Sequence, residues 1–176
     1  MNHSATFDVK SVDTLGGDVY RVFLLGQNLI FIGLGGAQAA KGINQGMEFL
    51  MGQLGIFGLL IRLVLKRRAI NKTEESLQRS GCDDPEVLLR EKEGSFEISI
   101  HEIRGSTIEP PTSLSLSAAQ TGYWKLILRD GRKYNFGFES VDGMRAALSL
   151  LPPVMNDALQ VKAEWDEAGG RFQKKK

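Results

Sequence analysis

The alternation of apolar and polar residues in the second half of the chain predicts an antiparallel meander. Apolar side chains occupy every second position from Phe96 to Ile100, and the same period of two recurs in Tyr123–Leu128 and Tyr134–Phe138. Between the last two strands, Arg129–Arg132 contains Asp-Gly, which is a strong signal for a tight hairpin turn. Ile103–Ile108 is a weaker strand in the same region.

Two apolar runs in the first third of the chain predict another hairpin. Val19–Leu25 and Leu29–Ile32 are rich in the β-branched and aromatic residues that favour strands. The residues between them, Gly26–Asn28, suit a short turn because glycine and asparagine tolerate positive φ angles.

Capping residues mark the start of two helices. Asp84 is an expected N-cap with proline at the first helical position, followed by a short helix over Glu86–Lys92. Ser140 is expected to cap a second helix, Val141–Leu151, whose apolar residues recur at helical spacing. A double proline then bends or interrupts this helix before Val154–Trp165.

The middle of the chain, from Gly33 to Glu93, differs from the rest in its residue composition. Its glycines and alanines often lie three or four residues apart, which places small residues on one helical face. The apolar run Phe49–Leu65 follows and ends at three cations, Lys66–Arg68. This run includes Gln53 and Arg62 and is shorter than the ~20 apolar residues of a spanning helix, so a buried or interfacial helix is favoured.

Composition narrows the class of protein. The 176 residues are 42% hydrophobic and 24% charged, as expected of one globular domain, and a net charge of +1 gives no overall attraction for nucleic acid. The one cysteine, Cys82, cannot form an internal disulfide, and His3 and His101 have no partners at a metal or catalytic spacing. We therefore expect a cytoplasmic, non-enzymatic protein with no cofactor, metal or nucleic-acid partner.

The order of these elements resembles a pleckstrin-homology-like domain, closest to the GRAM and bacterial varieties. The resemblance is carried by Phe96–Ile103 (FEISIHEI), by Trp124–Phe138 (WKLILRDGRKYNFGF) and by the helix from Ser140, with Tyr20–Ile32 in the place of the early strands. It implies an α+β fold in which an antiparallel β-meander forms a partly open barrel capped by a C-terminal helix.

The resemblance also implies a domain organisation. Residues 5–168 are expected to form a single domain of this kind, with residues 34–93 as a helical, glycine-rich insertion within it and residues 169–176 as a flexible basic tail. Phosphoinositide-binding members carry a basic cluster around the first two strands, where this chain has Lys10 and Arg21 far apart.

The leading hypothesis is an interaction module that binds through the insertion. An apolar run followed by cations suits an anionic membrane surface, with a protein partner as an alternative occupant. The residues expected to make the apolar contact are Phe49, Leu50, Ile56, Phe57, Leu60 and Ile61, and those expected to form the charged rim are Arg62, Lys66, Arg67 and Arg68.

Two other hypotheses use the same part of the chain. In the first, the insertion buries its apolar residues against the barrel or against a second copy in a homo-oligomer. In the second, Gly33–Ala37 forms a nucleotide-binding turn after a strand, although Gln38 stands in place of the third glycine and no further βαβ unit follows.

Overall fold

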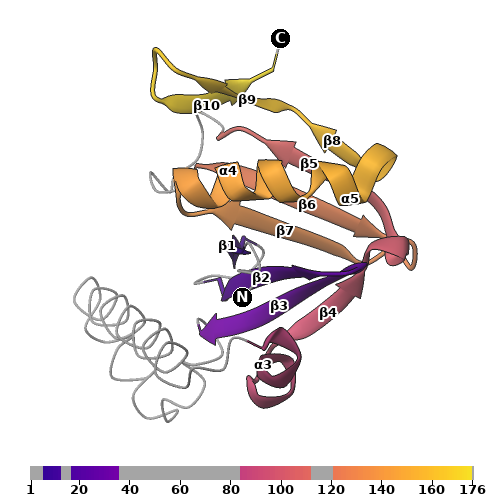
Figure 1. Ribbon diagram of the computed structural model, residues 1–176. Coiled ribbons are helices and arrows are strands. Elements are labelled where there is room, and N and C mark those ends of the chain that lie inside the picture. Colours follow the sequence, from indigo (N-terminus) through magenta and orange to yellow (C-terminus); the bar gives the residue numbers. More distant parts are fainter. Residues whose placement is uncertain (1–5, 13–16, 36–83, 112–120, 176) are drawn as a thin grey trace, which may run out of the picture.

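The protein has an α+β fold built on one large, mostly antiparallel sheet (Figure 1). The computed structural model describes residues 6–12, 17–35, 84–111 and 121–175. The eight strands of the sheet are β1 (Thr6–Ser11), β2 (Val19–Leu25), β3 (Asn28–Gly35), β4 (Phe96–Ser99), β5 (Ile103–Glu109), β6 (Gly122–Leu128), β7 (Lys133–Phe138) and β8 (Leu159–Val161).

The strand order, β4-β3-β2-β1-β7-β6-β5-β8, divides the sheet into two meanders. β1 to β4 form the first and β5 to β7 the second, and the two are joined by antiparallel pairing of β1 with β7, in which Val9 lies opposite Phe138. β8 adds to β5 in parallel. No pairing between described strands connects β4 with β8, so the sheet is not a closed barrel.

Both predicted hairpins are confirmed. β2 pairs with β3 across Gly26, whose φ of 59° is the left-handed conformation expected of this turn. β6 pairs with β7 across a turn in which Gly131 has a φ of 91°. The strand expected to begin at Phe96 is β4, and the residues after it, Ile100–Glu102, form a short 3₁₀ turn before β5.

The helices start where the capping residues indicated. The Asp84 carboxylate accepts a hydrogen bond from the Glu86 amide at the start of α3 (Pro85–Glu91). The Ser140 hydroxyl accepts from the Gly143 amide at the start of α4 (Val141–Leu150). α4 then buries one side, including Met144 and Ala147, against β1 and β7.

The expected continuation after the double proline is wrong beyond its first turn. α5 (Pro152–Met155) is followed by a 3₁₀ turn, then by β8 and by β9 (Ala163–Asp166). From Val161 to Trp165 the apolar residues alternate, which suits a strand, because a helix would scatter them around its surface.

The expected flexible tail is also wrong for most of its length. Arg171–Lys174 form β10, which pairs with β9 in a separate two-stranded hairpin. Phe172 is buried against the main core, and its ring meets Trp165 edge to face with centroids 5.0 Å apart. Burial of the Phe172 side chain and pairing with β9 together stabilise this terminal strand.

The inner face of the sheet, together with α4, α5 and the terminal hairpin, forms the main core. Aromatic rings from both meanders meet there: the Phe31 ring of the first lies 5.2 Å from the Phe136 ring and 6.0 Å from the Trp124 ring of the second. The fully buried side chains of this core include Val9, Val22, Leu29, Phe31, Ile108, Trp124, Leu126, Phe138, Met144, Ala147 and Leu151.

Ser106 is the buried polar partner of this core. It is 4% exposed, and its hydroxyl accepts a 2.9 Å hydrogen bond from the indole N–H of Trp124.

We predict that Ser106→Ala lowers the free energy of unfolding in urea by about 1–3 kcal/mol, because the indole N–H stays buried without a partner. Ser149→Ala, at an exposed position of α4, is the matched control and should change stability by less than ~0.5 kcal/mol. An equal effect of the two variants would contradict this assignment.

Glu109 holds β6 and the end of β8 to β5. Its carboxylate oxygens lie 2.6 Å from the Lys125 Nζ and 3.2 Å from the Lys162 Nζ. The hydrogen bond from Lys125, aided by Lys162, lowers the pKa of Glu109 below its ordinary value of 4.5, against the opposing effect of burial.

A lowered folded-state pKa gives stability that is present above the unfolded-state pKa and is lost as pH falls through the folded-state value. At pH 7 the unfolding free energy of wild type should therefore be higher than that of Glu109→Gln. The difference should be less than ~1 kcal/mol, because both lysines are partly exposed to screening water. The difference should vanish in urea titrations carried to about pH 3. Glu97→Gln, which removes an exposed carboxylate from β4, is the control. A difference that grows towards low pH would refute the ion-pair assignment.

Candidate functional site

All ten residues of the predicted interaction surface lie in residues 36–83, outside the described part of the chain. The described residues on either side fix where this segment begins and ends. It begins after Gly35, at the end of β3, and ends at Asp84, the N-cap of α3. Residues 36–83 and α3 together are therefore the connection between the neighbouring antiparallel strands β3 and β4.

The two ends of this connection are tied together at what we call the insertion base: Gly33, and the Glu93–Ser95 turn between α3 and β4. The Gly33 amide donates a 3.0 Å hydrogen bond to the Ser95 hydroxyl. A Cβ at Gly33 would lie 2.9 Å from the Glu93 carbonyl oxygen, so only glycine lets the turn approach this closely. Gly33 lies within β3 with its amide occupied, which differs from the phosphate-binding turn considered for it.

A second apolar cluster lies next to the insertion base, on the side of β2 and β3 opposite the main core. We call this cluster the outer face; it consists of Val19, Phe23, Ile30, Ile32 and Leu34, which are 0–7% exposed. α3 lies over β3 and contributes buried Leu88 and half-buried Leu89 to the cluster (Figure 1).

The outer face was not recognised from the sequence, although a signal for it exists. Val19–Leu25 and Leu29–Ile32 are almost continuously apolar, whereas β4 and β6 alternate. A strand with one face in water alternates, and a strand covered on both faces does not. The lack of alternation in β2 and β3 thus marks a sheet that is covered on both sides.

At the insertion base the main core ends in three half-buried rings, Tyr20, Phe96 and Tyr134. The Phe96 ring stacks on Phe31 with centroids 4.6 Å apart and on Tyr134 at 5.5 Å, and Tyr20 meets it edge to face at 5.3 Å. Burial, with the neighbouring Asp18 carboxylate and Tyr134, raises the pKa of Tyr20 to about 12. The Tyr20 hydroxyl therefore keeps its proton at neutral pH and can donate a hydrogen bond.

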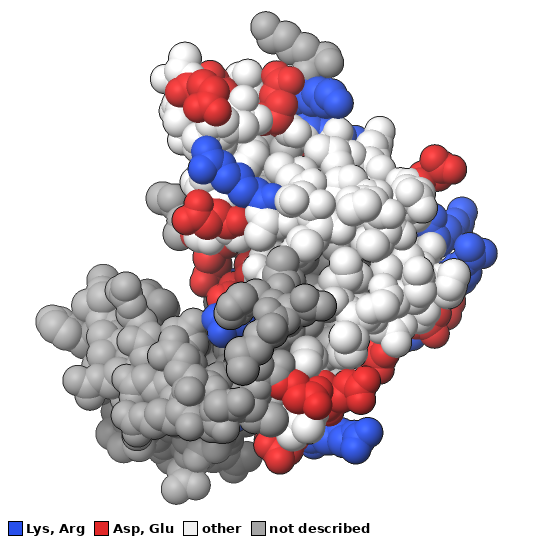
Figure 2. All heavy atoms as spheres, in the orientation of Figure 1, with Lys and Arg blue, Asp and Glu red and all other residues white. Residues whose placement is uncertain are grey.

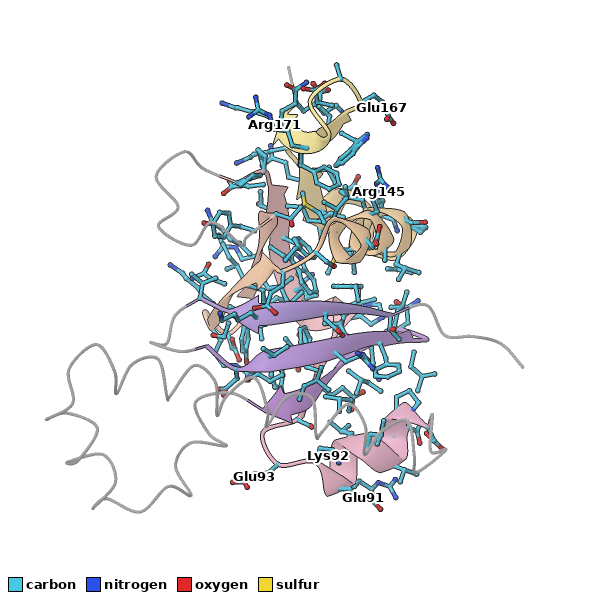
Figure 3. The ribbon with its side chains drawn as sticks, turned by 90° about the vertical axis from the view of Figure 1, so that its left-hand side faces the viewer. Glu91, Lys92, Glu93, Arg145, Glu167 and Arg171 are labelled. Carbon is cyan, nitrogen blue, oxygen red and sulfur yellow. The ribbon has the colours of Figure 1, made fainter. Side chains whose placement is uncertain are left out.

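The other end of the molecule carries the β9–β10 hairpin. Figure 3 shows Arg145 on α4 beneath this hairpin, with Glu167 and Arg171 on the hairpin itself. The Arg145 guanidinium lies 4.1 Å from the centroid of the Trp165 ring, and the buried Trp165 Nε1 has no hydrogen-bond partner among the described residues. This contact fastens the hairpin to α4.

Charged side chains are absent from much of the face formed by α4 and α5. The sequence from Ala146 to Asn156 contains no charged residue, and Figure 2 shows a broad uncharged area there, with charged groups mostly around its margin. Ser149, Pro153 and Asn156 are its exposed members, and Leu148, Leu150 and Val154 are half buried. The area is therefore uncharged but presents few large apolar side chains to solvent.

The described residues offer neither a metal site nor a membrane-spanning helix. They contain no group of three or more His, Cys, Asp or Glu side chains that could hold a metal ion. None of the helices within the described ranges is long and apolar enough to cross a membrane.

Comparisons with protein-family models, with curated proteins and with solved structures found no match for this chain.

The close approach at the insertion base can be tested by adding one methyl group. We predict that Gly33→Ala lowers the unfolding free energy by about 1–3 kcal/mol, because the added Cβ would overlap the Glu93 carbonyl oxygen, a backbone atom. Gly105→Ala is the matched control, since a Cβ there meets nothing within 4 Å, and it should change stability by less than ~1 kcal/mol. Equal urea midpoints for Gly33→Ala and wild type would show that the turn does not press on β3.

Proposed function

We propose that the protein is a non-enzymatic interaction module that binds anionic membrane surfaces through the segment between β3 and α3. The observation that carries the proposal is the position of this segment: it replaces the turn between two neighbouring strands, so it enters and leaves at one place in the sheet. Long insertions at such connections leave the strand pairing intact and commonly carry binding residues.

The chemistry of the segment suits an anionic surface. The apolar run Phe49–Leu65 carries Arg62 near its end and is followed directly by Lys66, Arg67 and Arg68. Each cation near an anionic bilayer adds about 1 kcal/mol of attraction at moderate salt. With a net charge of +1 for the whole chain, binding depends on this local group of cations.

We also propose that the two meanders and α4 form a partly open barrel of the pleckstrin-homology-like kind. The proposal is supported by the rings of Phe31 and Phe136, which meet across the interior from separate meanders, and by α4, which follows the last strand of the second meander and packs on β1.

Liposome sedimentation tests the membrane proposal. Wild type should sediment with vesicles containing about 30% phosphatidylserine and remain in the supernatant with pure phosphatidylcholine vesicles, and raising the salt from 0.1 M to 0.5 M should reduce binding. Lys66→Ala/Arg67→Ala/Arg68→Ala should weaken binding at least tenfold, since about 3 kcal/mol of attraction is removed.

The matched control is Arg129→Ala/Arg132→Ala/Lys133→Ala, which removes three cations from the β6–β7 hairpin and should bind like wild type. Equal loss in both triple variants would point to general charge attraction. Absence of sedimentation under every lipid condition would refute membrane binding and leave a protein partner as the occupant to seek.

A further inference from the structure

We propose that the outer face is the docking surface for the apolar run Phe49–Leu65 of the same chain. This deepens the function proposed above by assigning the apolar residues of the segment to the domain itself. The cations that follow the run are then the groups left to meet the membrane, so membrane contact is electrostatic and the apolar side chains do not enter the bilayer.

α3 is too small to account for the burial of the outer face. α3 is seven residues long, packs on β3 and contributes Leu88 and half-buried Leu89 to the cluster. The outer face also includes Val19 and Phe23 of β2, which are 5% and 7% exposed. Burial at that level across two strands requires a covering element broader than α3.

The connection between β3 and α3 is attached to the sheet beside the outer face. Residues 36–83 start two residues after Leu34 of the outer face and end at the cap of α3, which already packs on that face. The residues that lead from Gly35 to Phe49 can span about 40 Å when extended, and those from Leu65 to Asp84 can span more. Both connections are long enough to let the run lie anywhere on the face.

The apolar run matches the outer face chemically. The outer face offers branched aliphatic side chains and one phenylalanine, and the Asp8–Arg21 ion pair lies beside Ile32 on the same side of the sheet. In Phe49–Leu65 only Gln53 and Arg62 are strongly polar, and a segment that is apolar on nearly all sides is typical of one covered by other parts of a protein. The charged end of α3, with Glu91, Lys92 and Glu93, lies outside the cluster (Figure 3).

Thiol labelling without lipid tests this docking. In a Cys82→Ser background, Val19→Cys places a reporter on the outer face and Val9→Cys places one in the main core, by the same substitution. Both should react with a thiol reagent at least a hundredfold more slowly than in urea. Phe57→Gln/Leu60→Gln/Ile61→Gln should then raise the rate at Val19→Cys at least tenfold and leave that at Val9→Cys unchanged.

Lys66→Ala/Arg67→Ala/Arg68→Ala is the control and should leave both labelling rates unchanged, because it removes only charge. If the triple glutamine variant also raises the labelling rate at Val9→Cys, Leu60→Ala is used in its place. Leu60→Ala should raise the labelling rate at Val19→Cys at least twofold and leave the rate at Val9→Cys unchanged. A labelling rate at Val19→Cys that stays slow in the glutamine variant would overturn the docking. Fast labelling at Val19→Cys in the chain without the glutamine substitutions would overturn it as well. A labelling rate at Val19→Cys that falls as the protein concentration rises would show that a second copy of the chain covers the outer face instead. None of these outcomes depends on whether the chain binds liposomes.

Discussion

The antiparallel pairing of β1 with β7 holds the molecule together. Val9 lies opposite Phe138 in this pairing, and through it two meanders that are far apart in the sequence become one sheet with a common inner face. The aromatic core exists only because of this connection, since Phe31 and Phe96 come from one meander and Trp124 and Phe136 from the other. Loss of this connection would leave two small sheets with exposed aromatic faces, and neither would bury enough area to be stable.

Two strands of the first meander, β2 and β3, differ from the strands of the second in carrying buried apolar residues on both faces. Their inner side belongs to the common core, and their outer side forms the cluster of Val19, Phe23, Ile30, Ile32 and Leu34. The long connection between β3 and β4 begins and ends at this doubly apolar part of the sheet. The segment in this connection carries both apolar residues suited to this face and cations suited to an anionic surface.

The local elements could be predicted because their signals are short in range. The Asp-Gly turn before Arg132, the Asp84 and Ser140 caps and the alternation along β6 each depend on neighbouring residues. The errors occurred where distant contacts outweigh local preference. Arg171–Lys174 is polar enough to suggest a tail, but Phe172 enters a core built by residues far away in the sequence, and this burial stabilises β10 together with its pairing to β9.

The sequence by itself determined the hairpins, the capped helices and the presence of an apolar, basic segment between β3 and α3, since each of these follows from local patterning. Only the tertiary structure decided that β1 joins β7, that Gly33 is pressed against the Glu93–Ser95 turn, and that β2 and β3 carry a second buried cluster. These features arise from the pairing and packing of residues widely separated in the chain, and local preferences do not specify which distant surfaces will meet.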